Sequence, residues 1–112
     1  MKLTLPFPPS MNHYWRRCGH IMHISEAGKR FRKDVQAVVG LRPRTISGRV
    51  SVSVTVFAPD RRVRDIDNLL KPMLDALTHS GIWLDDGQVD DLRIVRGPVE
   101  KPGRVEVLIE TI

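Results

Sequence analysis

Two carboxylates and a lysine lie close together near the middle of the chain, at spacings that suit phosphate chemistry. Asp65 and Asp67 are two residues apart, so in an extended segment their side chains project to the same side. Lys71 follows Asp67 by four residues, which places it about one turn further along the same face once a helix begins. We therefore expect these three side chains to project together.

A second acidic pair, Asp85 and Asp86, follows Lys71 in the chain. A helix of about twelve residues is ~18 Å long, so Asp86 returns to the first two acids only if the chain reverses. Gly81 permits that reversal because glycine readily ends a helix. The alternative is that Asp67 is a helix cap and Asp85-Asp86-Gly87 is only a turn.

Clustered carboxylates indicate a magnesium site, because Mg²⁺ is a hard cation that prefers oxygen ligands. In phosphodiester hydrolysis such an ion activates water and neutralises charge in the transition state, and a nearby lysine stabilises the same charge. Three arginines precede the acids, Arg61, Arg62 and Arg64, and can hold phosphates that the carboxylates repel. The residues alone therefore favour metal-dependent phosphodiester chemistry.

Charge is divided unevenly along the chain. Residues 1–64 hold 13 lysines and arginines against 3 acids, a formal charge of +10, whereas residues 65–112 hold 5 against 10, a charge of −5. A basic half suits a polyphosphate ligand such as nucleic acid. Carboxylates beside such a ligand need a cation between them, which again favours a metal-dependent enzyme over a purely DNA-binding module.

Length and composition limit the architecture. The 112 residues suit one domain over 1–112, and the single cysteine, Cys18, excludes an intrachain disulfide framework. Three prolines interrupt the first apolar stretch, Pro6, Pro8 and Pro9, so we expect no signal peptide. No run approaches the ~18 apolar residues of a membrane span. We expect a cytoplasmic protein without a membrane partner.

Hydrophobic periodicity predicts the order β-α-β-α-β-β, a small mixed sheet with two main helices packed on it. Residues 10–24 carry no clear period and are expected to form a loop. The expected strands are 1–5, 50–57, 92–95 and 105–110, and the expected helices are about 26–39 and 68–79.

The ends of both helices carry signals of their own. Ser25 is a suitable N-cap for the first helix, and Gly40 and Pro43 should stop it. For the second helix, Asp67 or Asn68 is the expected N-cap. Further expectations for that helix are Pro72 in or near its first turn and Gly81 after its end.

Several longer stretches resemble the RusA family of Holliday junction resolvases. The central block reads Pro59-Asp60-Arg61-Arg62-x-Arg64-Asp65-x-Asp67-Asn68-Leu69-x-Lys71, then Asp75-Ala76-Leu77, then Gly81-x-Trp83-x-Asp85-Asp86-x-Gln88-Val89. The N-terminal half contributes Leu5-Pro6-Phe7-Pro8-Pro9-Ser10-x-Asn12 and Ser25-x-x-Gly28-x-x-Phe31-Arg32. Two positions depart from the family pattern, Val63 and Pro72.

This resemblance implies a homodimeric α+β endonuclease that resolves four-way DNA junctions by paired symmetric nicks, with Mg²⁺ as cofactor or Mn²⁺ in its place. It makes Asp65, Asp67 and Asp86 the essential acids and metal ligands, and Lys71 the catalytic lysine. Asp85 and Asn68 match neighbouring positions, and Arg64 matches a DNA contact. A bacterial or phage origin and a role in DNA recombination and repair follow from the family.

Dimerisation also has a physical reason, because a two-fold protein matches a two-fold junction that needs two nicks. Two alternatives stay open: a basic DNA-binding module without activity, and a metal nuclease that cuts flaps or other branched DNA. DNA contacts are expected from the basic residues beyond the site as well. The expected DNA-binding set is Arg61, Arg62, Arg64, Arg16, Arg17, Lys29, Arg30, Arg32 and Lys33.

Weaker signals allow more than one interpretation. Cys18, His20 and His23 fit no strong zinc spacing, and a DNA-facing loop is favoured there. Tyr14 and Trp15 suit either base stacking or packing under that loop. Trp83 is expected in the core or a dimer interface.

Overall fold

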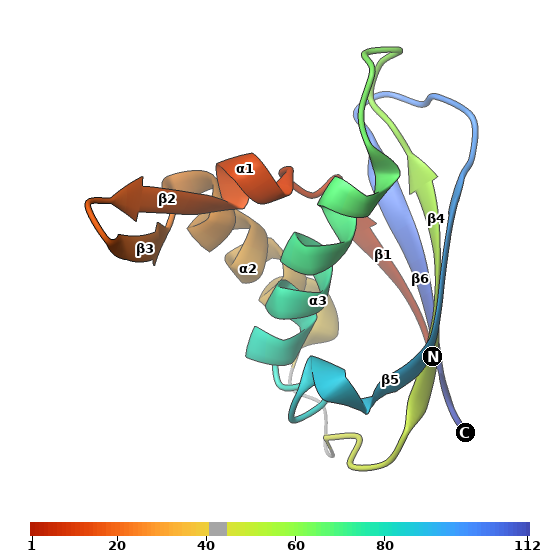
Figure 1. The fold of residues 1–112 in the computed structure, drawn as a ribbon. Helices are drawn as coiled ribbons and strands as arrows, with labels where there is room; N and C mark the ends of the chain where they lie inside the picture. The colour runs from red at the N-terminus through yellow and green to blue at the C-terminus, as the bar shows by residue number, and fades with distance from the viewer. Residues whose placement is uncertain (41–44) are drawn as a thin grey trace.

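A four-stranded mixed sheet with two helices on one of its faces forms the body of the protein (Figure 1). The computed structural model describes residues 1–40 and 45–112. The strands are β1 (Lys2–Pro6), β4 (Val50–Phe57), β5 (Val89–Arg96) and β6 (Arg104–Thr111), in the order β1-β6-β4-β5. This arrangement confirms the predicted α+β class with a mixed sheet.

Strand β4 is the centre of the sheet. It pairs antiparallel with β6 and parallel with β5, while β1 pairs antiparallel with the other side of β6. Four valines of β4 alternate with polar residues and are almost fully buried: Val50, Val52, Val54 and Val56. Their common face is the one that the helices cover, as the period-two pattern predicts.

The parallel pairing of β4 with β5 requires a crossover, and this crossover carries the acidic residues. It runs from the end of β4 through the 3₁₀ turn η1 (Ile66–Leu69), helix α3 (Leu70–His79) and the 3₁₀ turn η2 (Asp86–Gln88) into β5. A crossover helix must pack on the sheet because its ends join neighbouring parallel strands. The candidate acids are therefore attached to the core at both ends of α3.

Helix α2 (Glu26–Val39) has the predicted bounds. The Ser25 hydroxyl accepts a hydrogen bond from the Gly28 N–H at 3.0 Å, which is the expected N-cap contact. Phe31 and Val35 form a buried stripe along the helix, and Gly40 ends it with φ +65°. The second predicted stop signal, Pro43, lies outside the described residues.

Helix α3 begins differently from the prediction. Its N-cap is Leu69, without a capping side chain, so the expected cap at Asp67 or Asn68 is wrong. The reason is that helical geometry starts earlier, in η1, which leaves both residues inside a 3₁₀ turn. Pro72 lies in the first turn of α3 as expected, where its missing N–H costs no hydrogen bond.

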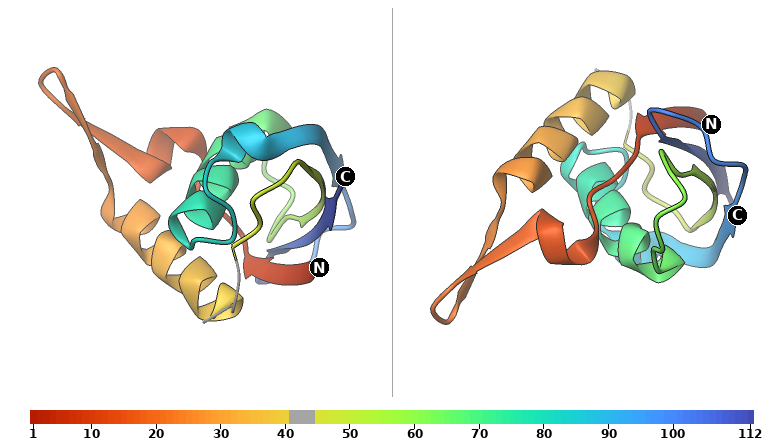
Figure 2. Two further views of the ribbon diagram at one scale, coloured as in Figure 1. Left: turned by 90° about the horizontal axis from the view of Figure 1, so that it is seen from below. Right: turned by 90° about the horizontal axis from the view of Figure 1, so that it is seen from above.

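Residues 10–24, predicted as a loop, form a short helix and a β-hairpin. The elements are α1 (Met11–Tyr14), β2 (Trp15–Cys18) and β3 (Ile21–Ile24), with Gly19 at φ +63° in the connecting turn. The prediction failed because the hairpin has no alternation of apolar and polar residues. It projects away from the sheet and the helices, as both views in Figure 2 show.

Two further strands are longer than predicted. Strand β5 begins at Val89 and continues to Arg96, beyond the expected 92–95, because it pairs along β4. Strand β6 also extends past both predicted ends.

Trp83 is buried beneath α3 and donates from Nε1 to Thr78 Oγ1 at 2.7 Å, so it belongs to the core of this chain. None of the helices in the described part of the chain is long and apolar enough to span a bilayer.

Candidate active site

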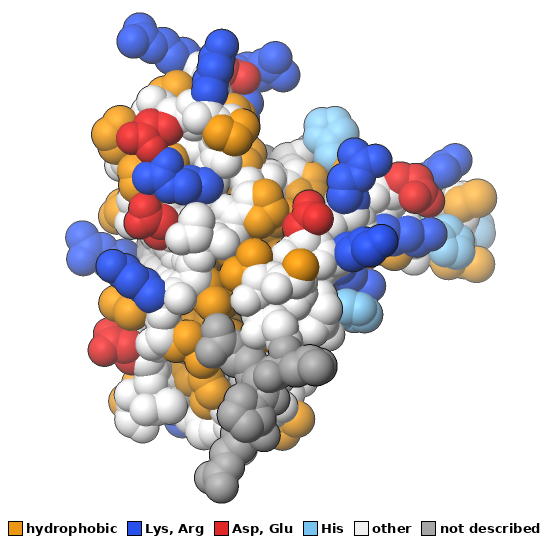
Figure 3. All heavy atoms as spheres, turned by 180° about the vertical axis from the view of Figure 1, so that it is seen from behind, with side chains coloured by type: hydrophobic (Ala, Val, Ile, Leu, Met, Phe, Trp, Pro, Cys, Tyr) orange, Lys and Arg blue, Asp and Glu red, His pale blue; other side chains and the backbone are white. Residues whose placement is uncertain are grey.

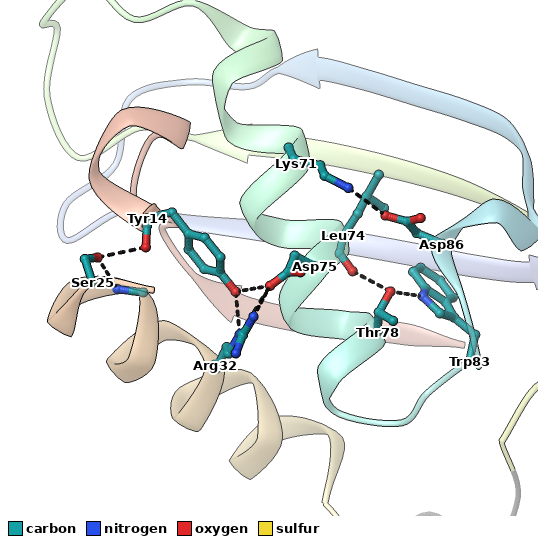
Figure 4. Close-up of polar contacts among 10 residues, drawn as sticks. Tyr14, Ser25, Arg32, Lys71, Leu74, Asp75, Thr78, Trp83 and Asp86 are labelled. Carbon is teal, nitrogen blue, oxygen red and sulfur yellow. Dashed lines mark hydrogen bonds and ion pairs between the residues drawn. The ribbon is translucent and has the colours of Figure 1, made fainter. Parts of the chain in front are cut away.

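Lys71 and Asp86 come together although fifteen residues separate them in sequence. Lys71 extends from the first turn of α3, and its Nζ lies 3.3 Å from Asp86 Oδ2 (Figure 4). The reversal that makes this contact follows Gly81, whose φ is +82°. The pair reaches solvent, since the Lys71 side chain is 56% exposed and that of Asp86 is 29% exposed. A ligand can therefore approach both groups.

Asp65 and Asp67 lie on the segment that leads into the same helix. Asp65 has extended backbone directly before η1, Asp67 lies within η1, and both side chains are exposed. Turns η1 and η2 both pack against α3. Across residues 1–40 and 45–112, however, no three His, Cys, Asp or Glu side chains come close enough together to hold one metal ion. The structure thus joins Lys71 to Asp86 and places Asp67 within η1 and Asp65 directly before it.

Two adjoining hollows, of about 380 and 460 Å³, are lined largely by the segment that precedes Asp65 in the chain. Phe7, Arg62 and Arg64 line both of them, and the second hollow continues to Asp65 and Asn68. We refer to these two hollows together as the arginine cleft. Positive walls in a concave surface attract phosphates more strongly than a flat surface does. The arginines that precede the acids in the sequence therefore also lie beside them in the structure.

Arg64 has internal partners within the arginine cleft. Its Nη1 lies 2.8 Å from Asp60 Oδ1, and its guanidinium stands 5.3 Å from the centre of the Phe7 ring. The hydrogen bonds that Asp60 accepts from Arg64 and from the Arg62 N–H lower the pKa of its carboxyl to about 2. Arg64 thus holds the loop in shape, while Arg61 and Arg62 are exposed.

Comparison with known proteins assigns the chain to a family. The sequence model for Endodeoxyribonuclease RusA matches residues 6–110. The crossover junction endodeoxyribonuclease RusA of Enterobacteria phage HK97 is 43% identical over 110 residues, which is 96% of this chain and 92% of the relative. The chain belongs to the RusA endodeoxyribonuclease family.

Two further RusA relatives are similar over nearly the same length. The crossover junction endodeoxyribonuclease of Enterobacteria phage 82 is 43% identical, and that of Escherichia coli strain K12 is 42% identical. Each alignment covers 109 residues, 96% of this chain and 91% of the relative. The family resemblance inferred from the motifs is confirmed.

In this member of the RusA family, Gln88 holds the turn that carries Asp86. Gln88 is buried, and its Oε1 accepts hydrogen bonds from the N–H groups of Leu84 and Asp85 at 2.9 and 3.1 Å. Its Nε2 donates to the carbonyls of Ile46 and Gly48 at 2.9 and 2.8 Å. The Gln88 N–H donates to the Asp85 carbonyl at 3.0 Å, so Asp85 begins this turn. Its role as a neighbour of the site stays a prediction.

The sequence predicted no structural role for Gln88, which was only one position of a motif. It also gave no indication that Arg96 lies near the candidate site. Arg96 lines the arginine cleft and donates to the carbonyl of Arg64. It reaches that place only through the parallel pairing of β4 and β5, in which Arg96 is the partner of Val56. A single sequence carries no local signal for such a contact.

A second charged cluster fixes α3 against α2. The buried Tyr14 donates its hydroxyl hydrogen to Asp75, while Arg32 contacts the Tyr14 hydroxyl at 2.9 Å and Asp75 Oδ2 at 2.8 Å (Figure 4). Burial, and then the hydrogen bond to Asp75, raise the pKa of the Tyr14 hydroxyl well above its usual value. Tyr14 is therefore a packed core residue rather than a stacking platform.

The other predicted DNA-binding residues lie on two surfaces. Arg32 points inward to Asp75, whereas Lys29, Arg30 and Lys33 are exposed along α2, with Lys29 3.5 Å from Glu26. Arg16 and Arg17 are exposed on the hairpin strand β2. DNA binding by these residues stays a prediction, and it is weakest for Arg32, whose guanidinium already has two internal partners.

Proposed function

We propose that this protein is a Mg²⁺-dependent endodeoxyribonuclease that resolves four-way DNA junctions, with its active site at the junction of η1, α3 and η2. The relatives carry the name crossover junction endodeoxyribonuclease, and the similarity covers nearly the whole chain. In this proposal Asp65, Asp67 and Asp86 bind the metal ion, and Lys71 lies beside the reacting phosphate.

The contact between Lys71 and Asp86 is the observation that carries the site assignment. It brings a cation and a carboxylate to one solvent-accessible place from two separate turns. An exposed ion pair contributes little to stability, because water competes for both charges. Such a pair is more readily explained by a ligand that separates it, such as a phosphate bound by the lysine and a cation bound by the acid.

The donor set suits magnesium rather than a softer metal. The three acids supply only carboxylate oxygens, and Mg²⁺ commonly binds through one or two carboxylates while keeping several waters. Waters would complete the ligand set of an ion held by these carboxylates. Mn²⁺ accepts the same oxygen ligands and is expected to substitute for Mg²⁺.

The protein's own groups divide the remaining work between binding and charge. Arg61 and Arg62 would hold phosphates next to the scissile one, while Lys71 would neutralise charge that develops on its oxygens. The metal ion, when bound, would supply an activated water and further neutralise that charge. Asn68, which lines the cleft beside Asp65, can donate a hydrogen bond to the DNA backbone.

We further propose that the active form is a homodimer. One chain carries one such site, and a four-way junction is resolved only by two symmetric nicks. The substrate of this activity would be branched DNA in the cytoplasm of a bacterium, in keeping with relatives from phages and from bacteria.

Cleavage assays with several substrates test the proposal. Wild-type protein is incubated with a labelled four-way junction, a flap and a linear duplex, with Mg²⁺, with Mn²⁺ and without metal. We expect paired nicks in the junction only, and only with metal. Binding without any cleavage would indicate a DNA-binding module, and cleavage of the flap alone would indicate a different branched-DNA nuclease.

The variant Asp67→Asn tests the acidic residues in the same assay. It should lose cleavage yet bind the junction at least as tightly as wild type, because a negative charge that faces phosphate is removed. Asp34→Asn is the matched control, since Asp34 is an exposed acid on a different element, helix α2. Wild-type cleavage by Asp67→Asn would contradict the site assignment.

A further inference from the structure

The hairpin formed by β2 and β3 ends in two apolar side chains that contact solvent. Ile21 is 61% exposed and Met22 is 58% exposed, next to the turn at Gly19 and His20. Figure 1 shows that the hairpin extends away from the sheet and helices. In the view from behind, a projecting arm ends in hydrophobic and histidine side chains, with lysines or arginines closer to the body (Figure 3).

The base of this hairpin is held rigidly by the core. The Tyr14 carbonyl accepts the Ser25 N–H at 2.9 Å, which closes the hairpin where it meets α1 and α2. Gly28 packs against the same carbonyl so closely that a Cβ there would stand 2.4 Å from its oxygen. Trp15 and Ile24 pair at the inner end and are partly buried. The exposed tip therefore has a direction that the core sets.

Charge around the tip favours a polyanion as its partner. Residues 15–24 contain two arginines and two histidines but no acid. Arg17 is directly opposite Met22, and Arg16 is opposite His23, so each face of the hairpin carries one arginine. Two copies of this tip would repel each other, whereas apolar side chains flanked by cations are the combination that proteins use to enter DNA between base steps.

We propose that Ile21 and Met22 insert between bases at the branch point of the DNA junction, while Arg16 and Arg17 contact the flanking phosphates. This inference rests on the proposed function. Inserting apolar side chains costs free energy because it unstacks a base step, and this cost is smallest where stacking is already interrupted. A branch point is such a place, so the hairpin tip would select junctions over continuous duplex.

Fluorescence of 2-aminopurine placed beside the branch point reports this unstacking directly. The protein is added to the junction without divalent metal, so that no strand is cut. We expect fluorescence to rise with wild type, and that rise to be lost with the double variant Ile21→Ser/Met22→Ser. The matched control is Ile112→Ser, because Ile112 is also exposed, at 73%, and lies at the other end of the chain. A full rise with the double variant would overturn the proposal.

Two accompanying measurements make each outcome informative. Light scattering gives the mass of the double variant, and a change from wild type would overturn the proposal by showing that the tip contacts a second copy. Junction affinity should fall by no more than about tenfold, since the arginines remain. Met22→Ser alone is the fallback if the double variant unfolds, and it should lose part of the rise.

The inference and the proposed function can fail separately. If wild type nicks the junction with Mg²⁺ but the double variant unstacks the bases as wild type does, only the inference is wrong. If wild type unstacks the junction through the tip but does not cut it with any metal, the nuclease proposal is wrong and the tip contact stands.

Discussion

Helix α3 carries two charged contacts one turn apart, and they differ in burial. Lys71 meets Asp86 at the surface, with 56% and 29% of the two side chains exposed. Four residues later Asp75 meets Arg32, where the exposed fractions are 27% and 25% and a buried tyrosine hydroxyl joins them. The inner contact joins α3 to α2, whereas a ligand could separate the outer pair at little cost because water already competes for its charges.

This difference follows from what surrounds each pair. An exposed pair loses most of its attraction to water, so breaking it costs little. A partly buried pair with shared hydrogen bonds leaves unsatisfied groups behind when one partner is removed. A fixed helix that presents an easily separated ion pair is a suitable arrangement for binding phosphate and metal.

The largest effect is expected at the outer contact. Lys71→Met should lower the rate of junction cleavage by about 100-fold, because a positive charge beside the reacting phosphate is lost. The free energy of unfolding should change by less than about 0.5 kcal/mol. Single-turnover cleavage and urea unfolding measure the two quantities. If Lys71→Met cleaves at the wild-type rate, or if it loses much stability, the outer contact does not act mainly in cleavage as proposed.

The inner contact should respond in the opposite way. Asp75→Ala leaves Arg32 and the Tyr14 hydroxyl without their acceptor, so we expect a loss of about 2 kcal/mol in the free energy of unfolding. Tyr14→Phe removes one hydrogen-bonding group and should cost about 1 kcal/mol. Cleavage measured at a temperature where both variants are folded should stay close to wild type. Unchanged unfolding curves would show that the cluster does not hold α3.

Gln88 tests whether the turn that carries Asp86 needs the same support. Gln88→Ala removes four hydrogen bonds to backbone groups and should lower the free energy of unfolding by about 2 kcal/mol. Cleavage should fall as well, because Asp86 loses its fixed position. Gln88→Glu keeps an acceptor for two of these bonds and should lie between wild type and Ala. Stable, fully active Gln88→Ala would mean that the turn is held by other contacts.

Secondary-structure elements whose ends are set by neighbouring residues could be predicted from the sequence, whereas elements that depend on contacts between distant residues could not. Helix α2 and strand β4 were predicted with their observed ends, because Ser25, the buried stripe and the valine alternation act within each element. The hairpin was missed because it depends on Ser25 and Gly28 meeting the carbonyl of Tyr14. Those contacts join residues more than ten positions apart, and no periodic pattern in the sequence indicates them.

The candidate site shows the same division. The shared segment of Asp65, Asp67 and Lys71 follows from spacing, whereas Asp86 was brought in by family resemblance, and its carboxylate lies 3.3 Å from Lys71 Nζ in the structure. Arg96 and the hydrogen bonds of Gln88 could not be predicted, since they depend on the parallel pairing of β4 with β5 and on the segment before β4. Long-range pairing decides these contacts.

The smallest expected effect concerns the loop of the arginine cleft. The carboxyl of Asp60 has its pKa lowered from 3.8 to about 2 by Arg64 and the Arg62 N–H. Because the folded pKa is the lower one, this tether is complete above about pH 4 and is lost as the pH falls towards 2. NMR titration of the Asp60 carboxyl measures it, and Arg64→Gln should return the pKa towards 3.8. An ordinary pKa in wild type would show that Arg64 is free to bind DNA.

A side-by-side comparison of Asp86→Asn and Asp75→Asn tests whether the two contacts of α3 have separate roles in cleavage and in stability. The two substitutions make the same chemical change at the two contacts of α3, and junction nicking and unfolding are measured for both. We predict that Asp86→Asn is as stable as wild type but does not nick the junction with Mg²⁺, while Asp75→Asn is less stable and still nicks it when folded. Nicking by Asp86→Asn at the wild-type rate would contradict the account.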